Sequence, residues 1–392
     1  MTENAQGEGR AEDLRALSRT GRDTPMGALL RQFWQPVAQS SDVAPGKARA
    51  IRRLGEDLTL YRGESGQPHL IGGFCAHRLT RLHTGWVEGE EIRCVYHGWK
   101  YDSAGQCTEM PAEREGLCQT VRIDGYPVHE YCGLIFAYMG EGEAPVFDLP
   151  RKDVFEMPDR LYFTRDQIWP CNWLQQVENS LDATHVSFVH QKGRVGRFGD
   201  AVTPAIPKLD YTETESGIRQ VATRGEGNVR VSDWTFPNNN HILIPSIRGD
   251  DRWIDIAIWL VPIDDETTTR QQIYSVPSLN VEADRMITEH FAKHVTYNPA
   301  DHHDTLFVDD EYPEETLLRL TSAQDYVAAV GQGAIVDRTA ERLGTSDAGI
   351  ATLRRILLRE MHQIQAGAPT KQWHKRDQSE ELLVPETEAS AG

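Results

Sequence analysis

The sequence predicts an α+β protein built from two successive domains. Its 392 residues are enough for two domains that each bury a hydrophobic core. From residue 33 to about residue 142, short β-type runs are separated by glycine-containing turns, which is typical of a small all-β domain. From residue 173 onward, segments with helical periodicity accompany longer strand-like runs. We therefore expect an all-β domain followed by a mixed domain.

Four segments are expected along the chain. Residues 1–32 form a polar arm with a short helix, and residues 33–145 form the all-β domain. Residues 146–370 form the second domain, which follows a linker containing glycine, proline and several charges. Residues 371–392 form an acidic tail, which we expect to be mobile because it has little apolar surface to bury.

Helices and strands within these domains follow from hydrophobic periodicity. In the first domain, Ile51, Leu58 and Leu60 lie in β-type runs. In the second domain, the expected helices are residues 173–189, 282–294 and 347–365. The expected strands are residues 217–222, 230–236, 241–247 and 253–261.

Charge and hydropathy narrow the classes of function. The formal net charge of −18 repels phosphate backbones, so we expect no nucleic-acid partner. We expect no membrane span, because the longest apolar runs are shorter than the roughly 18 residues that a spanning helix needs. The first 22 residues are polar and contain no apolar leader segment, so we expect the cytoplasm.

Two Cys-His pairs are the most informative feature of the sequence. Cys75 and His77 form the first pair; sixteen residues later, Cys94 and His97 form the second. Each pair places a thiolate and an imidazole on one short loop. Such a set suits a [2Fe–2S] centre with both thiolates on one iron and both imidazoles on the other. Structural zinc is the alternative, although zinc sites favour C-x(2–4)-C and H-x(3–5)-H groupings.

The residues around these ligands resemble a known family. The segments Cys75-Ala76-His77-Arg78 and Cys94-Val95-Tyr96-His97-Gly98-Trp99 are similar to the two boxes of the Rieske domain in ring-hydroxylating oxygenases. The chain departs from that pattern at Ala76 and Val95, where proline is common, and at Leu79, where glycine is common. The remaining cysteines lie outside the boxes and are interpreted as ordinary thiols: Cys107, Cys118, Cys132 and Cys171.

A second motif, Asp182-x(2)-His185-x(4)-His190, lies in the expected helix 173–189. Asp182 and His185 are three residues apart and share a helix face. His190 would point elsewhere on an ideal helix, so joint ligation requires the helix to distort or end near Ser187. Two imidazoles and one carboxylate with open positions hold ferrous iron for dioxygen. The spacing matches the mononuclear-iron motif of the same family; without that match, both histidines would be interpreted as partly buried helix residues.

The carboxylate ligand of this site must come from farther along the chain. Asp347 begins the last predicted helix, where an aspartate commonly caps free N–H groups. The stretch from Gly331 to Asp347 nevertheless resembles the phthalate-dioxygenase-like branch of the family, and this resemblance implies that Asp347 is the third iron ligand. The candidates are Asp301, Asp304, Asp325, Asp337 and Asp347.

The resemblance extends from Gly21 to the last helix and implies a fold. It implies a Rieske β-sandwich domain followed by a catalytic domain with an antiparallel sheet wrapped around a long helix. In this family an aspartate links a Rieske histidine of one subunit to an iron histidine of the next. Asp182 would hold that position between His97 and His185. The implied assembly is a head-to-tail ring, as a homotrimer or as stacked trimers.

The reaction implied by the resemblance consumes dioxygen and two electrons. It hydroxylates or O-demethylates an aromatic compound, and we expect an aromatic acid. The implied electron donor is a flavin- and ferredoxin-containing reductase that oxidises NADH or NADPH. Two other classes stay open: a Rieske electron carrier without oxygenase activity, and a zinc-stabilised binding module. A red-brown colour and a ferrous-iron signal with nitric oxide would separate the three.

Residues that contact the substrate are expected on the strand around residues 238–247. Alternate residues of a strand share one face, so we expect His241, Leu243 and Ile247 to line the cavity. Arg248, at the end of this strand, would either pair with a substrate carboxylate or be a solvated loop residue.

Overall fold

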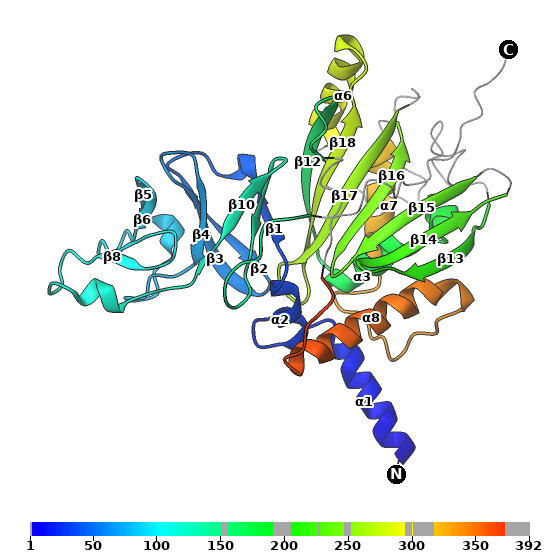
Figure 1. The fold of residues 1–392 in the computed structure, drawn as a ribbon, viewed down its shortest axis with the longest axis horizontal. Helices are drawn as coiled ribbons and strands as arrows, with labels where there is room; N and C mark the ends of the chain where they lie inside the picture. Colours follow the sequence, from blue (N-terminus) through cyan, green and yellow to red (C-terminus); the bar gives the residue numbers. More distant parts are fainter. Residues whose placement is uncertain are drawn as a thin grey trace. The chain divides into compact units, whose positions relative to one another are not determined.

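The computed structural model divides into two compact units (Figure 1). The smaller unit comprises residues 19–147 and 261–265, and the larger unit comprises residues 1–18, 148–260 and 266–392. The structure describes residues 2–149, 155–190, 205–225, 228–246, 252–294, 300 and 317–372.

The smaller unit is built from three antiparallel sheets of short strands. Their strand orders are β1-β11-β10, β2-β3-β4-β9 and β5-β6-β7-β8. A short helix, α2 (Pro25–Arg31), precedes them. The strands are β1 (Gln35–Gln39), β2 (Ala48–Arg53), β3 (Glu56–Arg62), β4 (Pro68–Gly72), β5 (Trp86–Glu88), β6 (Glu91–Arg93), β7 (Lys100–Tyr101), β8 (Cys107–Glu109), β9 (Gly125–Tyr126), β10 (Val128–Tyr131) and β11 (Leu134–Ala137).

The apolar residues that predicted strands in this unit are buried in its sheets. Leu58 and Leu60 of β3 are 2% and 0% exposed, and Ile51 of β2 pairs with Leu58. The prediction of an all-β domain is therefore confirmed. Burial of one face of each short sheet supplies most of the favourable free energy that such strands need.

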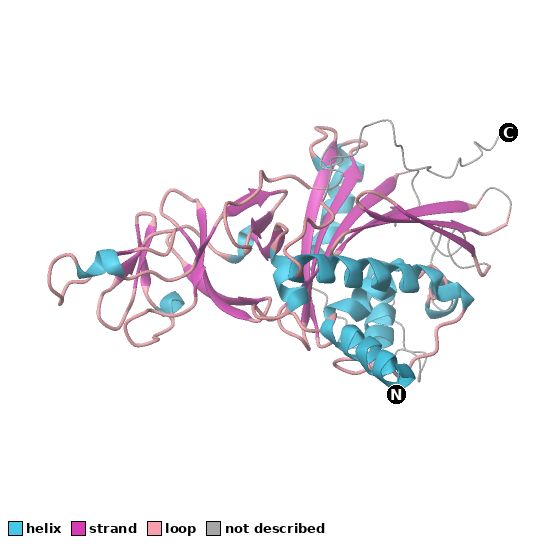
Figure 2. Ribbon diagram, turned by 60° about the horizontal axis from the view of Figure 1, so that its bottom comes forward, coloured by secondary structure: helices cyan, strands magenta, loops and turns pink. Residues whose placement is uncertain are grey.

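The larger unit contains one antiparallel sheet of seven strands in the order β12-β18-β17-β16-β15-β14-β13. Most of its helices gather on one side of this sheet (Figure 2). The strands are β12 (Arg160–Trp169), β13 (Lys208–Glu213), β14 (Gly217–Thr223), β15 (Val229–Thr235), β16 (Asn239–Pro245), β17 (Trp253–Pro262) and β18 (Thr268–Pro277). The helices are α1 (Thr2–Ala16), α3 (Trp173–Leu181), α4 (Val186–Val189), α6 (Val281–His294), α7 (Leu317–Val330) and α8 (Ala348–Gln365).

Helix α3 lies at the centre of this unit. It contacts β15 and β16 of the sheet, and α7 and α8 pack against it. The predicted sheet with a central helix is confirmed, as are the predicted strands β14 to β17 and the helices α6 and α8. Within the part of the chain that the structure describes, no helix is long and apolar enough to cross a membrane.

The prediction of one helix over residues 173–189 is wrong. Helix α3 ends at Leu181, and α4 begins at Val186. Asp182 leaves the helical region with φ −89° and ψ 109°, and its side-chain Oδ1 accepts a hydrogen bond from the Thr184 N–H at 2.7 Å. An aspartate that bonds a neighbouring backbone N–H competes with helix continuation, which explains the interruption.

A buried carboxylate ties α3 to two other segments of the larger unit. Glu178 Oε1 accepts from Arg354 Nε at 2.6 Å, and Glu178 Oε2 accepts from Arg338 Nη2 at 3.1 Å. Arg338 also donates to Ser18 Oγ at 3.1 Å. The side chains of Arg338 and Arg354 are 2% and 9% exposed, so solvent cannot replace these contacts.

We expect Glu178→Ala to lower the free energy of unfolding by about 3–5 kcal/mol, because it leaves buried Arg338 without a carboxylate partner. Urea denaturation followed by tryptophan fluorescence measures this loss. Glu289→Ala is the matched control: it breaks an exposed pair with Arg285 and should cost less than about 0.5 kcal/mol. Equal losses in the two variants would contradict the proposed importance of the buried pair.

Candidate metal centres

Two loops of the smaller unit carry the Cys-His pairs, and both close in the same way. The Cys75 N–H donates to the Thr80 carbonyl at 2.9 Å, and the Cys94 N–H donates to the Trp99 carbonyl at 2.8 Å. In each loop the residue four after the cysteine donates back to the cysteine carbonyl. These two residues, Leu79 and Gly98, have φ of 57° and 74°.

The left-handed backbone at Leu79 explains why glycine suits this position. A residue with a Cβ adopts that conformation at a cost of roughly 1–2 kcal/mol, whereas glycine adopts it without strain. Leu79 is also 72% exposed, so its side chain gains little from packing. The loop therefore forms despite the departure from the family pattern.

The two thiols in these loops are less exposed to solvent than the two imidazoles. Cys75 and Cys94 are 1% and 2% exposed, whereas His77 is half-buried and His97 is exposed. The rings of His77 and His97 have centroids 4.4 Å apart, and His77 stacks on Trp99 at 4.6 Å. Two inner thiolates and two outer imidazoles are the donors that a [2Fe–2S] centre of mixed ligation needs.

A tyrosine hydroxyl lies beside one of the thiols. Tyr101 Oη is 3.2 Å from Cys75 Sγ and accepts a hydrogen bond from the Ala76 N–H at 3.1 Å. Burial is the main reason that the pKa of Cys75 is raised, and the neighbouring Cys94 thiol adds to it. A hydrogen bond to a cluster sulfur stabilises the reduced form and raises the reduction potential. All six cysteines are free, and these include the four interpreted above from the sequence as ordinary thiols.

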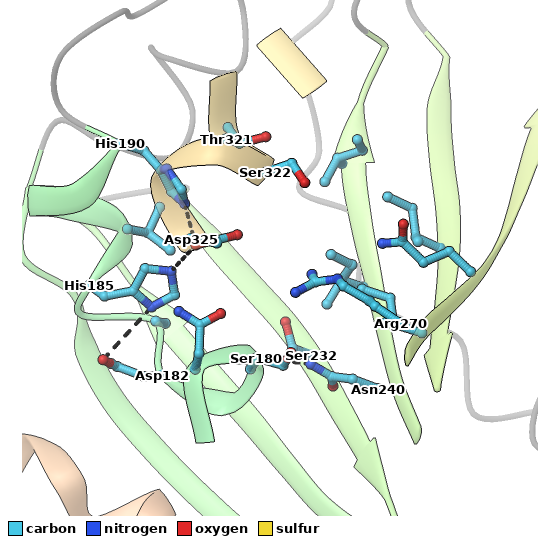
Figure 3. A pocket seen from close by; sticks show the side chains of 18 of the residues that line it. Ser180, Asp182, His185, His190, Ser232, Asn240, Arg270, Thr321, Ser322 and Asp325 are labelled. Atoms are coloured by element: carbon cyan, nitrogen blue, oxygen red, sulfur yellow. Dashed lines mark hydrogen bonds and ion pairs between the residues drawn. The ribbon is translucent and has the colours of Figure 1, made fainter. Parts of the chain in front are cut away.

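The larger unit brings two histidines and one aspartate together (Figure 3). His185 Nε2 and His190 Nε2 each lie 3.3 Å from Asp325 Oδ1. The histidines flank α4, and the aspartate comes from α7. Metal–ligand bonds of about 2.1 Å at right angles place ligand atoms about 3 Å apart, so these donors are spaced to share one metal ion.

The outer nitrogen of each imidazole faces a different partner. His185 Nδ1 lies 3.7 Å from Asp182 Oδ2, and His190 Nδ1 lies 2.9 Å from Gln324 Oε1. Contacts of this kind orient a ligand ring and leave its Nε2 free to bind a metal. The predicted proximity of Asp182 and His185 is confirmed, although Asp182 lies after the end of α3 and not on its face.

Electrostatics at this cluster favour a cation. Burial alone would raise the pKa of Asp325, but His190 and His185 outweigh burial and hold that pKa far below its usual range. Burial alone would lower the pKa of His185, but Asp182 and Asp325 outweigh it and raise the pKa to about 9. Asp325 Oδ1 is buried and has no hydrogen-bond partner among the described residues. The triad is therefore consistent with a mononuclear iron site.

The prediction that Asp347 completes this triad is corrected by the structure. Asp347 lies at the start of α8, and its Oδ2 accepts the Gly344 N–H at 2.6 Å. Asp337 is also elsewhere, where it accepts hydrogen bonds from Thr339. The candidates Asp301 and Asp304 lie outside the described residues. The Asp347 carboxylate thus accepts a hydrogen bond from a nearby backbone N–H, whereas Asp325 on α7 lies beside the two histidines.

Asp325 had one signal in the sequence. It is the single carboxylate in the otherwise apolar and neutral-polar helix LLRLTSAQDYVAAV, apart from one arginine. Charged residues are rarely buried unless they are paired or bind a metal. A lone acid in a helix that packs on another helix is therefore a ligand candidate. Because more than a hundred residues separate it from the histidines in the sequence, the sequence does not show that they meet.

A cavity of about 140 Å³ adjoins the triad. Four isoleucines from β16 and β17 form an apolar part of its wall: Ile242, Ile244, Ile256 and Ile258. Arg165, Arg230 and Arg270 also line it. Its wall is therefore apolar in the middle of the sheet and cationic toward the flanking strands.

The expectation that His241 and Leu243 line this cavity is wrong. The cavity takes Asn240 and Ile242 from β16, which lie on the opposite face. His241 Nε2 instead lies 3.1 Å from Asp255 Oδ1. A shift of one residue moves every side chain of a strand to its other face, so the error is one of register. Ile247 and Arg248 lie outside the described residues.

Family models match both units. Residues 33–130 match the Rieske [2Fe-2S] domain, and residues 137–383 match the "LigXa C-terminal domain like" family. The match to the first model identifies the Cys-His loops as a [2Fe–2S] centre and not a zinc site.

Individual proteins agree with these matches. The chain is 34% identical to the 5,5'-dehydrodivanillate O-demethylase oxygenase subunit of Sphingobium sp., over 92% of this chain and 82% of that protein. It is 30% identical to the phthalate 4,5-dioxygenase oxygenase subunit of Pseudomonas putida, over 90% of this chain and 86% of that protein. The oxygenase in the reduced complex with ferredoxin of carbazole 1,9a-dioxygenase has the same fold, with a TM-score of 0.63, 20% identity, and coverage of 89% of this chain and 97% of that chain.

The chain belongs to the Rieske oxygenase alpha subunits, and it is thus a Rieske non-heme iron oxygenase. Within that family it is related to the phthalate dioxygenase and dehydrodivanillate O-demethylase oxygenase subunits. The predicted family and class of enzyme are confirmed.

We expect Asp325→Ala to lose the mononuclear iron, about one iron fewer per chain, while the Rieske absorption bands remain. The reason is that the two histidines alone offer too few ligands for tight binding. Iron analysis and the high-spin electron paramagnetic resonance signal with nitric oxide measure this site. Asp347→Ala is the matched control and should keep both. Loss of the signal in Asp347→Ala with retention in Asp325→Ala would reverse the assignment.

Proposed function

We propose that this protein is the terminal oxygenase of a system that hydroxylates or O-demethylates an aromatic acid. The observation that carries the proposal is a single cavity that contains the His185, His190 and Asp325 triad, an isoleucine wall and buried arginines. The dioxygenase and demethylase relatives described above are named for phthalate and dehydrodivanillate, both aromatic carboxylates, which supports the same class of substrate here.

The triad is proposed to hold ferrous iron. Iron with two imidazoles and one carboxylate keeps open positions and supplies the dioxygen chemistry of this class of enzyme. The protein's own contribution is orientation: Asp182 and Gln324 aim the two Nε2 atoms at the site. The isoleucine wall excludes water and gives an aromatic ring an apolar surface to pack on. A cavity of about 140 Å³ is close to the roughly 150 Å³ that holds one benzene ring in an apolar protein interior.

Arg270 supports a negatively charged substrate. It is 8% exposed and projects into the cavity from β18, and its guanidinium lies 4.9 Å from the Trp169 ring centroid (Figure 3). Its Nε and Nη1 atoms are buried and have no hydrogen-bond partner among the described residues. Burial lowers the pKa of Arg270, and Asp325 only partly opposes this. A buried cation without a bonded anion costs free energy, and a substrate carboxylate would remove that cost.

We expect Arg270→Gln to raise the KM for an aromatic acid by about 10–100-fold, because a hydrogen bond to a charged group contributes roughly 1.5–3 kcal/mol. The KM for the uncharged amide of the same acid should change little. Oxygen uptake coupled to NADH oxidation gives both values. Arg285→Gln removes an exposed positive charge on α6 and serves as the control. Equal effects on acid and amide would contradict a carboxylate contact.

Electron delivery is proposed to cross a subunit boundary. A flavin- and ferredoxin-containing reductase would reduce the Rieske centre with electrons from NADH or NADPH. His97 is exposed in its unit, and the Asp182 side chain is 30% exposed in the other. Both groups are therefore accessible to a second copy of the chain. This accessibility supports a head-to-tail ring, as a trimer or stacked trimers, in which Asp182 joins His97 of one subunit to His185 of the next.

We expect Asp182→Asn to keep both metal centres and normal reduction of the Rieske centre, while product formation falls by at least about 10–100-fold. The amide keeps the shape of the side chain but removes the negative charge that is proposed to orient the His185 and His97 imidazoles. Stopped-flow absorbance and product analysis separate the two steps.

A mixed oligomer tests the subunit crossing. Combining Cys75→Ala chains with His185→Ala chains should restore partial turnover, because some interfaces then pair an intact cluster with an intact iron site. Complete inactivity of a verified mixed oligomer would show that electrons stay within one chain.

A further inference from the structure

A second pair of arginines lies beside the ladder of β14 and β15: Arg224 directly follows β14, and Arg230 is on β15. Gln220 of β14 and Arg224 are four residues apart, and both contact the chain near the end of α3: Gln220 Nε2 donates to the Leu181 carbonyl, and Arg224 Nη2 donates to the Ala183 carbonyl at 3.0 Å. Arg230 of β15 is opposite Ala222 of β14. Arg230 lines the cavity, and Arg224, one residue beyond the last pair of this ladder, is its diagonal neighbour.

These two arginines have no acidic partner among the described residues. Arg224 is 5% exposed, and its Nε and Nη1 atoms are buried without a hydrogen-bond partner. Arg230 lines the cavity, where its one described hydrogen bond is from Nη2 to the Leu243 carbonyl at 2.8 Å. Within the described part of the chain, both donate to carbonyl oxygens alone, and several of their N–H groups are left for a ligand.

Like charges in this position are unfavourable without a ligand. Burial first, and then the neighbouring Arg224, lower the pKa of Arg230 to about 10, and burial lowers the pKa of Arg224. Two diagonal cations on one sheet face repel each other. A carboxylate between them would offset both the repulsion and the lost hydration, and guanidinium groups bind carboxylates in a two-point geometry.

The pair lies apart from Arg270. In the strand order β18-β17-β16-β15, three intervals of about 4.8 Å separate the strands that carry Arg270 and Arg230, or roughly 14 Å. The isoleucines of β16 and β17 lie between them. The two cationic groups thus come from strands that are not neighbours, on the two sides of the isoleucine wall. Two carboxylates on opposite edges of one ring would be separated in the same direction.

We propose that Arg224 and Arg230 bind a second carboxylate, so that the preferred substrate is an aromatic dicarboxylate with its acid groups on non-adjacent ring carbons. This inference rests on the proposed function, which assigns the first carboxylate to Arg270.

A ligand panel tests the inference on the unaltered holoenzyme. Under anaerobic conditions, isothermal titration calorimetry would give the Kd of benzoate, phthalate, isophthalate and terephthalate. We expect isophthalate or terephthalate to bind at least about 10-fold more tightly than benzoate, because a second charge-assisted contact is formed. Phthalate, whose acid groups are adjacent, should gain much less.

Variants connect that difference to the pair. Arg230→Gln should raise the Kd of the preferred dicarboxylate by about 10-fold or more and leave the Kd of benzoate within about twofold. Arg224→Gln should act in the same direction. Arg230→Lys keeps a charge and should retain part of the difference. Arg285→Gln is the control for loss of one positive charge far from this face, and the Rieske spectrum and the thermal midpoint confirm that each variant is folded.

Three results would overturn the inference. Equal binding of benzoate and all three dicarboxylates by the unaltered enzyme would exclude a second carboxylate contact. Tightest binding of phthalate would contradict the separation of the two cationic groups. An equal loss of benzoate and dicarboxylate affinity in Arg230→Gln would mean that the pair serves the first carboxylate. Absence of binding by every acid would instead overturn the proposed function, so the two failures are distinguishable.

Discussion

The buried carboxylate of Asp325 is the interaction on which the catalytic unit depends. A charged oxygen with no hydrogen bond lies 3.3 Å from each of two imidazole nitrogens. Such a group is costly in a protein interior unless a cation neutralises it. Helix α7 must therefore carry this acid to the histidines, and α3 must end early enough to let both histidines turn toward it. The packing of α7 against α3 meets that requirement.

The end of α3 is stabilised by side chains of the sheet. The last carbonyl groups of a helix have no partner within the helix itself. Here Asn240 donates to the Ser180 carbonyl at 2.8 Å, and Gln220 donates to the Leu181 carbonyl. Arg224, which directly follows β14, donates to the carbonyl of Ala183, two residues beyond the helix. The polar side chains of the sheet thus replace the next helical turn. The same sheet face then continues into the cavity wall, so one surface both supports the chain that carries the histidines and lines the proposed substrate site.

Charge is distributed unevenly in this protein. The whole chain has a formal net charge of −18, yet the cavity is lined by three arginines. Net charge describes long-range behaviour, such as solubility and repulsion from nucleic acid, and does not describe an enclosed site. In the cavity, the low polarity of the isoleucine wall strengthens the electrostatic interaction between each arginine and a bound anion. An acidic protein can therefore present a cationic site to a small anion.

The sequence by itself determined the two-domain order, most strands and helices of the second domain, the four Cys and His residues of the loops and the pair His185 and His190. These features depend on residues close together in the chain, where periodicity and spacing are readable. Tertiary structure decided the rest. Asp325 in place of Asp347, and Asn240 and Ile242 in place of His241 and Leu243, depend on which helix and which strand face meet the site. The physical reason is that a backbone N–H satisfied Asp347 locally, whereas Asp325 acquires its partners through packing between segments that are far apart in sequence.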